Sequence, residues 1–270
     1  MTLALTLRAR PEQRLDLSPL VPHLLAGKSA ADINSIELQT TRMRMTVGDA
    51  FHLRMGNAGH ICIESACDRL DGVGAGMSGG EIAVVGDVGV QAGRLMTGGR
   101  LVISGNAGHW TASGMKGGEI EIKGSAGDRL GGPLAGEVAG MRGGLVIVRK
   151  DVGARAGDRL RRGTILIEGS AGDYAGSRMI AGTLIVRRKA GALPGYLMKR
   201  GTIIVGEGCV ALSPTFVDCG THALIVMRLM RNFIKTYSKG AAVLLDLPLR
   251  RYAGDMAVLG KGELFTGNPN

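Results

Sequence analysis

The histidine, serine and acidic residues are the first place to look for chemistry, and their spacing supports none. The histidines are scattered along the chain: His23, His52, His60, His109 and His222. No two of them have the spacing of a zinc-binding helix, and no Gly-x-Ser-x-Gly nucleophile motif occurs. We therefore predict that the chain holds no catalytic residues and no metal site.

The cysteines carry no motif either. Cys62, Cys67, Cys209 and Cys219 lack Cys-x-x-Cys spacing and have no histidine at ligand spacing, so we interpret them as free thiols in a reducing compartment. The first residues lack the basic and long apolar regions of a signal peptide, and no apolar stretch is long enough to cross a bilayer. These features predict a cytoplasmic protein.

Aspartate is followed by arginine at three similar places: Asp68-Arg69, Asp128-Arg129 and Asp158-Arg159. A catalytic carboxylate is one interpretation. The pairs recur, however, at one position of an internal repeat, and recurrence favours a structural role. We expect salt bridges and turn hydrogen bonds at a corner of the chain.

The repeat itself is 19 residues long. Its second glycine, or the equivalent residue, stands at Gly80, Gly99, Gly118, Gly144, Gly163, Gly182 and Gly201. Every spacing is 19 residues except that from Gly118 to Gly144, which is 26 because a Gly/Pro loop is inserted. A fixed period of this length is typical of a solenoid.

Each repeat predicts one β-strand. Apolar residues lie two and four positions after the glycine, as at Ile120 and Ile122, so both point to one side of a strand. A third column, mostly methionine, is interpreted as flexible core filler, with a metal-binding methionine row as the alternative. We predict an all-β fold, a right-handed parallel β-helix of about seven to eight 19-residue coils flanked by N- and C-terminal capping segments.

The flanking segments differ from the repeats. We predict an N-terminal cap over residues 1–45 and a β-helix domain over 46–210, with regular coils from about residue 77. Residues 211–270 are predicted to form a C-terminal segment with one helix. That helix would carry apolar side chains on one face: Val226, Leu229, Met230, Phe233, Ile234 and Tyr237.

The chain is strongly basic, with a formal net charge of +10, which indicates an acidic partner or ligand. Two positions before the repeat glycine, cations recur at Lys116, Arg142, Arg161 and Lys199. Like charges stacked about 5 Å apart repel by roughly 1 kcal/mol per pair even in water. They form either a solvated basic edge or a track that binds a polyanion.

The position three residues after the repeat glycine forms a column that should point outward from the strands. In the later repeats it becomes apolar, at Ile147, Leu166, Ile185 and Ile204. A contiguous apolar stripe on an outer face marks a covered surface. We predict a partner interface there, and the alternative is that the chain's own C-terminal helix covers the stripe.

The second half of each repeat contains a Gly-x-x-Gly-x-x-x-Gly motif, intact for example at Gly86, Gly89 and Gly93. A phosphate-binding loop occurs once, between a strand and a helix, whereas this motif recurs and so indicates tight corners. The repeat columns and corners resemble the repeat domain that ends the large subunit of glutamate synthase. They resemble still more closely the C subunit of formylmethanofuran dehydrogenase.

The second resemblance covers nearly the whole chain. Outside the regular repeats it includes LAGKSAADI (25–33), the lengthened repeat GDRLGGPLAGEVAGMRGG (127–144) and GDMAVLGKGELF (254–265). The family divides into two kinds of complex, and a chain rich in arginine and alanine but poor in lysine and aromatics looks bacterial. This favours the formyltransferase/hydrolase complex.

That resemblance implies a complex that transfers formyl from formyl-tetrahydromethanopterin to a methanofuran-type carrier and hydrolyses it to formate. The first alternative is the C subunit of a CO₂-reducing tungsten or molybdenum formylmethanofuran dehydrogenase. The second alternative is a repeat domain of the glutamate-synthase type. By resemblance, catalysis belongs to amidohydrolase and formyltransferase subunits. This chain would then be a non-catalytic scaffold that binds no cofactor for chemistry of its own.

The resemblance also implies partners. They are the amidohydrolase and formyltransferase subunits and a further subunit of the same complex, with no nucleic acid and no membrane. The carrier of this family has a glutamate-rich tail, which would suit Lys116, Arg142, Arg161 and Lys199 as a binding track.

Overall fold

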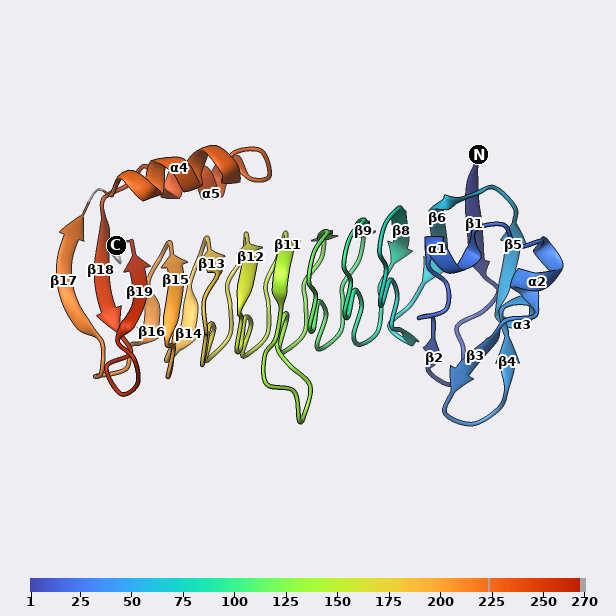
Figure 1. Cartoon of the computed structure of the whole chain (residues 1–270), viewed down its shortest axis with the longest axis horizontal. Coiled ribbons are helices and arrows are strands. Elements are labelled where there is room, and N and C mark those ends of the chain that lie inside the picture. The colour runs from blue at the N-terminus through green and yellow to red at the C-terminus, as the bar shows by residue number, and fades with distance from the viewer. Residues whose placement is uncertain (223, 268–270) are drawn as a thin grey trace.

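A row of parallel strands, one from each repeat, runs along the length of the molecule (Figure 1). The computed structural model describes residues 1–222 and 224–267. The repeat strands are β8 (Glu81–Gly86), β9 (Arg100–Ile103), β10 (Glu119–Ile122), β11 (Arg142–Val148), β12 (Arg162–Ile167), β13 (Thr183–Val186) and β15 (Arg200–Val205). The chain is mostly strand with few helices, so the all-β class is confirmed.

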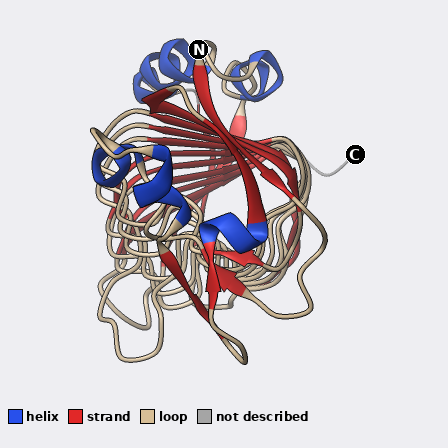
Figure 2. Cartoon of the chain, turned by 90° about the vertical axis from the view of Figure 1, so that its right-hand side faces the viewer, coloured by secondary structure: helices blue, strands red, loops and turns tan. Residues whose placement is uncertain are grey.

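Equivalent residues of neighbouring repeats pair in register. Ile120 of β10 lies opposite Leu101 of β9 on one side and Val146 of β11 on the other. A second row of parallel bridges joins small residues of successive repeats: Val88, Ala107, Ala126, Val152, Ala171 and Ala190. Seen along the row, the strands superimpose on one side and the connections surround the other sides (Figure 2).

The predicted inward columns are confirmed. The methionine column is completely buried: Met77, Met96, Met115, Met141, Leu160, Met179 and Met198. The two strand columns, such as Ile120 and Ile122, are buried with them in one continuous core. The glycine before each strand lets neighbouring backbones come close. At Gly163 φ is +97°, and a Cβ atom would lie 2.7 Å from the carbonyl oxygen of Gly144.

The N-terminal segment adds strands to the same sheet. β1 (Thr2–Leu7) pairs in parallel with β6 (Asn57–Ala66) and antiparallel with β5 (Phe51–Arg54). The remaining elements are β2 (Leu15–Asp16), β3 (Glu37–Thr40), β4 (Met45–Thr46), β7 (Leu70–Asp71), α1 (Pro22–Leu25), α2 (Ala30–Asn34) and α3 (Val47–Ala50). α2 and α3 each begin at a capping box, formed by Ser29 with Asp32 and by Thr46 with Asp49.

The C-terminal segment also joins the sheet. Its elements are β16 (Cys209–Ala211), which pairs with β14 (Ala190–Ala192), then β17 (Val217–His222), α4 (Ile225–Ile234), α5 (Lys239–Leu244), β18 (Leu249–Gly254) and β19 (Lys261–Thr266). β19 pairs in parallel with β15, as another repeat would, and β18 and β17 follow antiparallel. The segment therefore holds two helices where the sequence predicted one.

Helices α4 and α5 lie against the outer face of the sheet, above β12, β13 and β15 in Figure 1. They enclose a second core that is separate from the one inside the repeats. Among the described residues, no helix is long and apolar enough to cross a membrane.

Candidate functional site

The four predicted cations lie in one row just ahead of the repeat strands, and all are exposed. The backbone holds this row in place, because each amide donates a hydrogen bond to the carbonyl of the preceding repeat's buried methionine. For example, the Arg142 amide lies 2.6 Å from the Met115 carbonyl oxygen and the Lys199 amide 2.8 Å from that of Met179. Ile180 interrupts the row between Arg161 and Lys199.

Further cations lie next to this row, at the starts of β12, β15 and β19. Arg142 of β11 pairs with Arg162 of β12 beyond a register shift, and Arg200 of β15 pairs with Lys261 of β19. All of these side chains are exposed. We call the whole group the cationic edge: Lys116, Arg142, Arg161, Arg162, Lys199, Arg200 and Lys261.

Cations on the outer face of the sheet are neutralised, unlike those of the edge. Arg100 lies within 3.3 Å of Glu81, Glu119 and Glu121. Arg149 contacts Glu121 at 2.6 Å and Glu168 at 3.5 Å. In the described part of the chain, no residue of the cationic edge has a carboxylate within 4.0 Å. The edge therefore presents net positive charge to an anion.

An open depression lies beside the edge at Lys199. Its lining comes from the inserted loop, from three later repeats and from the loop before β19: Gly136, Glu137, Val138, Arg159, Arg178, Ile180, Leu197, Lys199 and Val258. Arg178 is held by the buried Asp158 at 2.5 Å, and Arg159 donates to the Glu137 carbonyl oxygen at 2.9 Å. No hydrogen bond or ion pair to another described residue engages the Lys199 side chain, so it is available to a ligand.

Glu137 fixes the inserted loop. Burial raises the pKa of its carboxyl, but a hydrogen bond from the Leu134 amide, the ion pair with Arg94 and the charge of Arg142 outweigh burial and hold the pKa below its usual value. The carboxylate accepts from Arg94 at 2.7 Å and from the Leu134 amide at 2.9 Å. The carboxylate that lines the depression is therefore already engaged.

The Asp-Arg dipeptides have structural roles. The Asp128 carboxylate accepts from the Ala154 amide of the next repeat at 2.8 Å, and Asp158 binds Arg178 and the Ser177 hydroxyl. Asp68 pairs with Arg10. The predicted salt bridges and hydrogen bonds exist, but they join different repeats or segments instead of the two residues of one dipeptide.

Metal-ligating and nucleophilic side chains are not gathered into a recognisable metal site among the described residues. No three histidine, cysteine, aspartate or glutamate side chains there lie close enough together to hold a metal ion. Burial raises the pKa of the Cys209 thiol, and burial with the nearby Glu64 raises that of Cys62. Both thiols are therefore poorer nucleophiles than an exposed cysteine at neutral pH.

The predicted partner interface is wrong. Ile147, Leu166, Ile185 and Ile204 are at most 1% exposed. They form the second core with residues of α4, α5 and the last strands: Met227, Ile234, Ala241, Leu244, Leu245, Leu249 and Phe265. The chain's own helices cover the stripe, because α4 and α5 present apolar side chains that are buried against it.

A relative among curated proteins decides the family. The C subunit of the formyltransferase/hydrolase complex Fhc of Methylorubrum extorquens is 48% identical over 262 residues, which cover 96% of this chain and 98% of the relative. The chain belongs to the family of Fhc C subunits. No family model matches the chain.

A solved structure supports membership of the Fhc family. In the crystal structure of the formyltransferase/hydrolase complex FhcABCD from Methylorubrum extorquens with methylofuran, one chain matches with a TM-score of 0.93 at 42% identity. The match covers 98% of this chain and 99% of the other. The preference for a formyltransferase/hydrolase complex over a dehydrogenase or a glutamate synthase is thereby confirmed.

Lys261 is the residue of the cationic edge of this Fhc family member that lies outside the repeats recognised in the sequence. Lys261 reaches the edge only because β19 pairs with β15. A signal was present, since Lys-Gly-Glu-Leu at 261–264 follows the pattern of Arg-Gly-Thr-Ile at 200–203, and each residue pairs with its counterpart. The 261–264 segment does not follow the preceding repeat at the 19-residue spacing, so the search for the period did not include it.

Proposed function

We propose that the chain is a structural, non-catalytic subunit of a formyltransferase/hydrolase complex. The complex would transfer formyl from formyl-tetrahydromethanopterin to a methanofuran-type carrier and hydrolyse it to formate. The observation that carries this proposal is the near full-length match to a chain crystallised in the FhcABCD complex with methylofuran. Its partners would be the amidohydrolase and formyltransferase subunits and a further subunit, in the cytoplasm.

The proposal includes the architecture of the repeats. A right-handed parallel β-helix over 46–210, capped by residues 1–45 and 211–270, is supported by the parallel register of β8 to β15 and by the second row of bridges. Parallel strands joined by a crossover connection are right-handed in nearly all known cases. Such a scaffold places one side chain of each repeat in a straight row.

The cationic edge is proposed to hold the acidic tail of the carrier. Cations without carboxylate partners, in a row fixed by the backbone, suit a flexible chain of carboxylates better than a compact ligand. Successive repeats are about 4.8 Å apart, so several carboxylates could be bound along the row.

The isolated chain is expected to hydrolyse no formylated carrier. It offers no activated nucleophile and no cluster of metal ligands among its described residues. Formate release would be measured with the pure subunit, and the assembled complex would serve as the positive control. Turnover by the isolated, metal-free subunit would contradict a purely structural role.

Replacing Arg142 and Arg161 together by serine is expected to leave assembly intact and weaken carrier retention. Two exposed ion pairs contribute about 0.2–1 kcal/mol each, so retention should fall by roughly two- to thirtyfold at low ionic strength. The difference should shrink as salt screens the charges. Carrier would be quantified in the purified complex over a series of salt concentrations.

The control is the double substitution of Arg42 and Arg44 by serine, because both are exposed cations on the turn between β3 and β4, outside the edge. It removes the same charge and should not change retention. If the Arg142→Ser/Arg161→Ser variant keeps its full complement of carrier at every ionic strength, the edge is only a solvated surface.

A further inference from the structure

Helix α4 is apolar on two faces. Its inner face buries Met227 and Ile234 in the second core. On its outer face, four apolar side chains remain exposed: Ile225 (79%), Val226 (49%), Leu229 (67%) and Phe233 (48%). We call these four residues the outer stripe. An exposed stripe of large apolar residues on one helix is typical of a contact surface.

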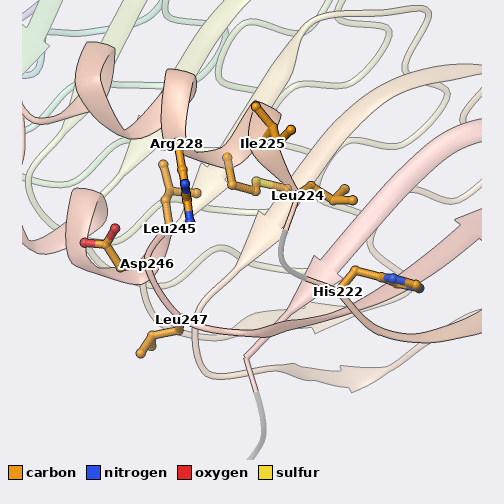
Figure 3. Close-up of a pocket in the computed structure, with 8 residues that line it drawn as sticks. His222, Leu224, Ile225, Arg228, Leu245, Asp246 and Leu247 are labelled. Carbon is orange, nitrogen blue, oxygen red and sulfur yellow. The ribbon is translucent and has the colours of Figure 1, made fainter.

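A socket lies at the start of the same helix (Figure 3). Its lining is mixed. The apolar side chains come from α4, from the residue before it and from the residues after α5: Leu224, Ile225, Met227, Leu245 and Leu247. His222, Arg228 and Asp246 supply its polar rim. The socket has a volume of about 250 Å³, which fits one large side chain. Ile225 belongs to both the socket and the outer stripe, so the two form one continuous surface.

The charge around this surface decides between possible occupants. Arg228 on α4, Lys235 at its C-terminal end and Lys239 at the start of α5 are exposed, and in the described part of the chain none has a carboxylate within 4.0 Å. Arg231, by contrast, pairs with Asp246 at 2.7 Å. A second copy of this chain would bring the same cations and a net charge of +10, so the two copies would repel. A different polypeptide with carboxylates around an apolar projection is complementary.

We propose that the outer stripe and its socket are the docking surface for another subunit of the complex. That subunit would pack apolar side chains against the outer stripe, place a side chain with an apolar stem and a polar end in the socket, and bring carboxylates near Arg228 and Lys235. This inference rests on the proposed function, since it names the surface through which the chain joins the assembly. The sequence analysis predicted the interface on the stripe of the sheet, which is buried, whereas this inference places it on α4, which covers that stripe.

The cationic edge and this surface are separate. In Figure 1 α4 lies above the strands, while the loop before β11, which lines the depression beside the edge, projects below them. A substitution on α4 can therefore be tested without altering carrier retention directly.

The test places a charge on the outer stripe. Leu229→Glu and Val226→Glu would each be co-expressed with the other subunits, and the amount of those subunits recovered with a tagged chain would be measured. Each variant should weaken assembly by about tenfold or more, since a charge at the centre of an apolar contact is desolvated. Thr41→Glu is the control, because it adds the same charge at an exposed polar position on the turn between β3 and β4, away from α4, and should assemble normally.

Two further measurements separate the outcomes. The melting temperature of each isolated variant should equal that of the unmodified chain, because Leu229 and Val226 are exposed. Full recovery of partners by both variants would overturn the docking surface while leaving the proposed function intact. Failure of the unmodified chain to recover any partner would overturn the proposed function itself. A dimer of the isolated chain that Leu229→Glu dissolves would assign the stripe to a second copy and overturn the inference.

Discussion

Replacing Ile120 by aspartate is expected to reduce the free energy of unfolding by about 4 kcal/mol. Ile120 is completely buried in the inner core, where it is stacked between Leu101 and Val146. An aspartate there must be protonated or lose its water without an ion pair in return. For a chain of this size the melting temperature should fall by roughly 10 °C, which calorimetry or thermal circular dichroism would detect.

Ile120→Val is the control for this variant. It removes one methylene group from the same position and should cost only about 0.5–1.5 kcal/mol. If the aspartate variant melts within a degree of the valine variant, the side chain at 120 does not point into the core and the inward assignment of its column is wrong.

Replacing Ile185 by glutamate is expected to detach α4 and α5 from the sheet. Ile185 lies on β13 between Leu166 and Ile204, in the second core beneath these helices. A glutamate could reach water only if the helices moved away, whereas the core inside the repeats would stay intact. Local opening should become easier by about 2–4 kcal/mol, so trypsin should cleave α4 at least about 30-fold faster.

The cleavage sites make this outcome specific. Arg228 and Arg231 lie on α4, and mass spectrometry of the early fragments would show whether cleavage begins there. Ile185→Leu keeps the volume and the apolar character, so its cleavage rate should change little. Unchanged cleavage of the glutamate variant would mean that the helices do not depend on the second core.

Local sequence pattern determined the strands and the inner core. The alternation of Ile120 and Ile122 fixed the inward face of a strand, and the 19-residue period fixed which residues stack. Both are properties of neighbouring or equally spaced residues, so no knowledge of distant contacts was needed. The row of Lys116, Arg142, Arg161 and Lys199 followed from the same period.

Contacts between distant segments were decided only by the tertiary structure. The outward column at Ile185 reads as an exposed stripe in the sequence, because nothing local indicates that residues 225–244 fold back over it. Lys261 joins the cationic edge only through the pairing of β19 with β15. Asp158 forms its salt bridge with Arg178 of the next repeat and not with its sequence neighbour Arg159.

The physical reason is that a column of apolar residues specifies burial without specifying the partner. Any apolar surface of suitable shape removes the same area from water, so the hydrophobic effect alone does not distinguish the chain's own helix from another subunit. That choice depends on the pairing of β17, β18 and β19 at the end of the sheet, which keeps α4 and α5 beside the stripe. The sequence by itself determined that the stripe is covered, and the tertiary structure decided that α4 and α5 cover it.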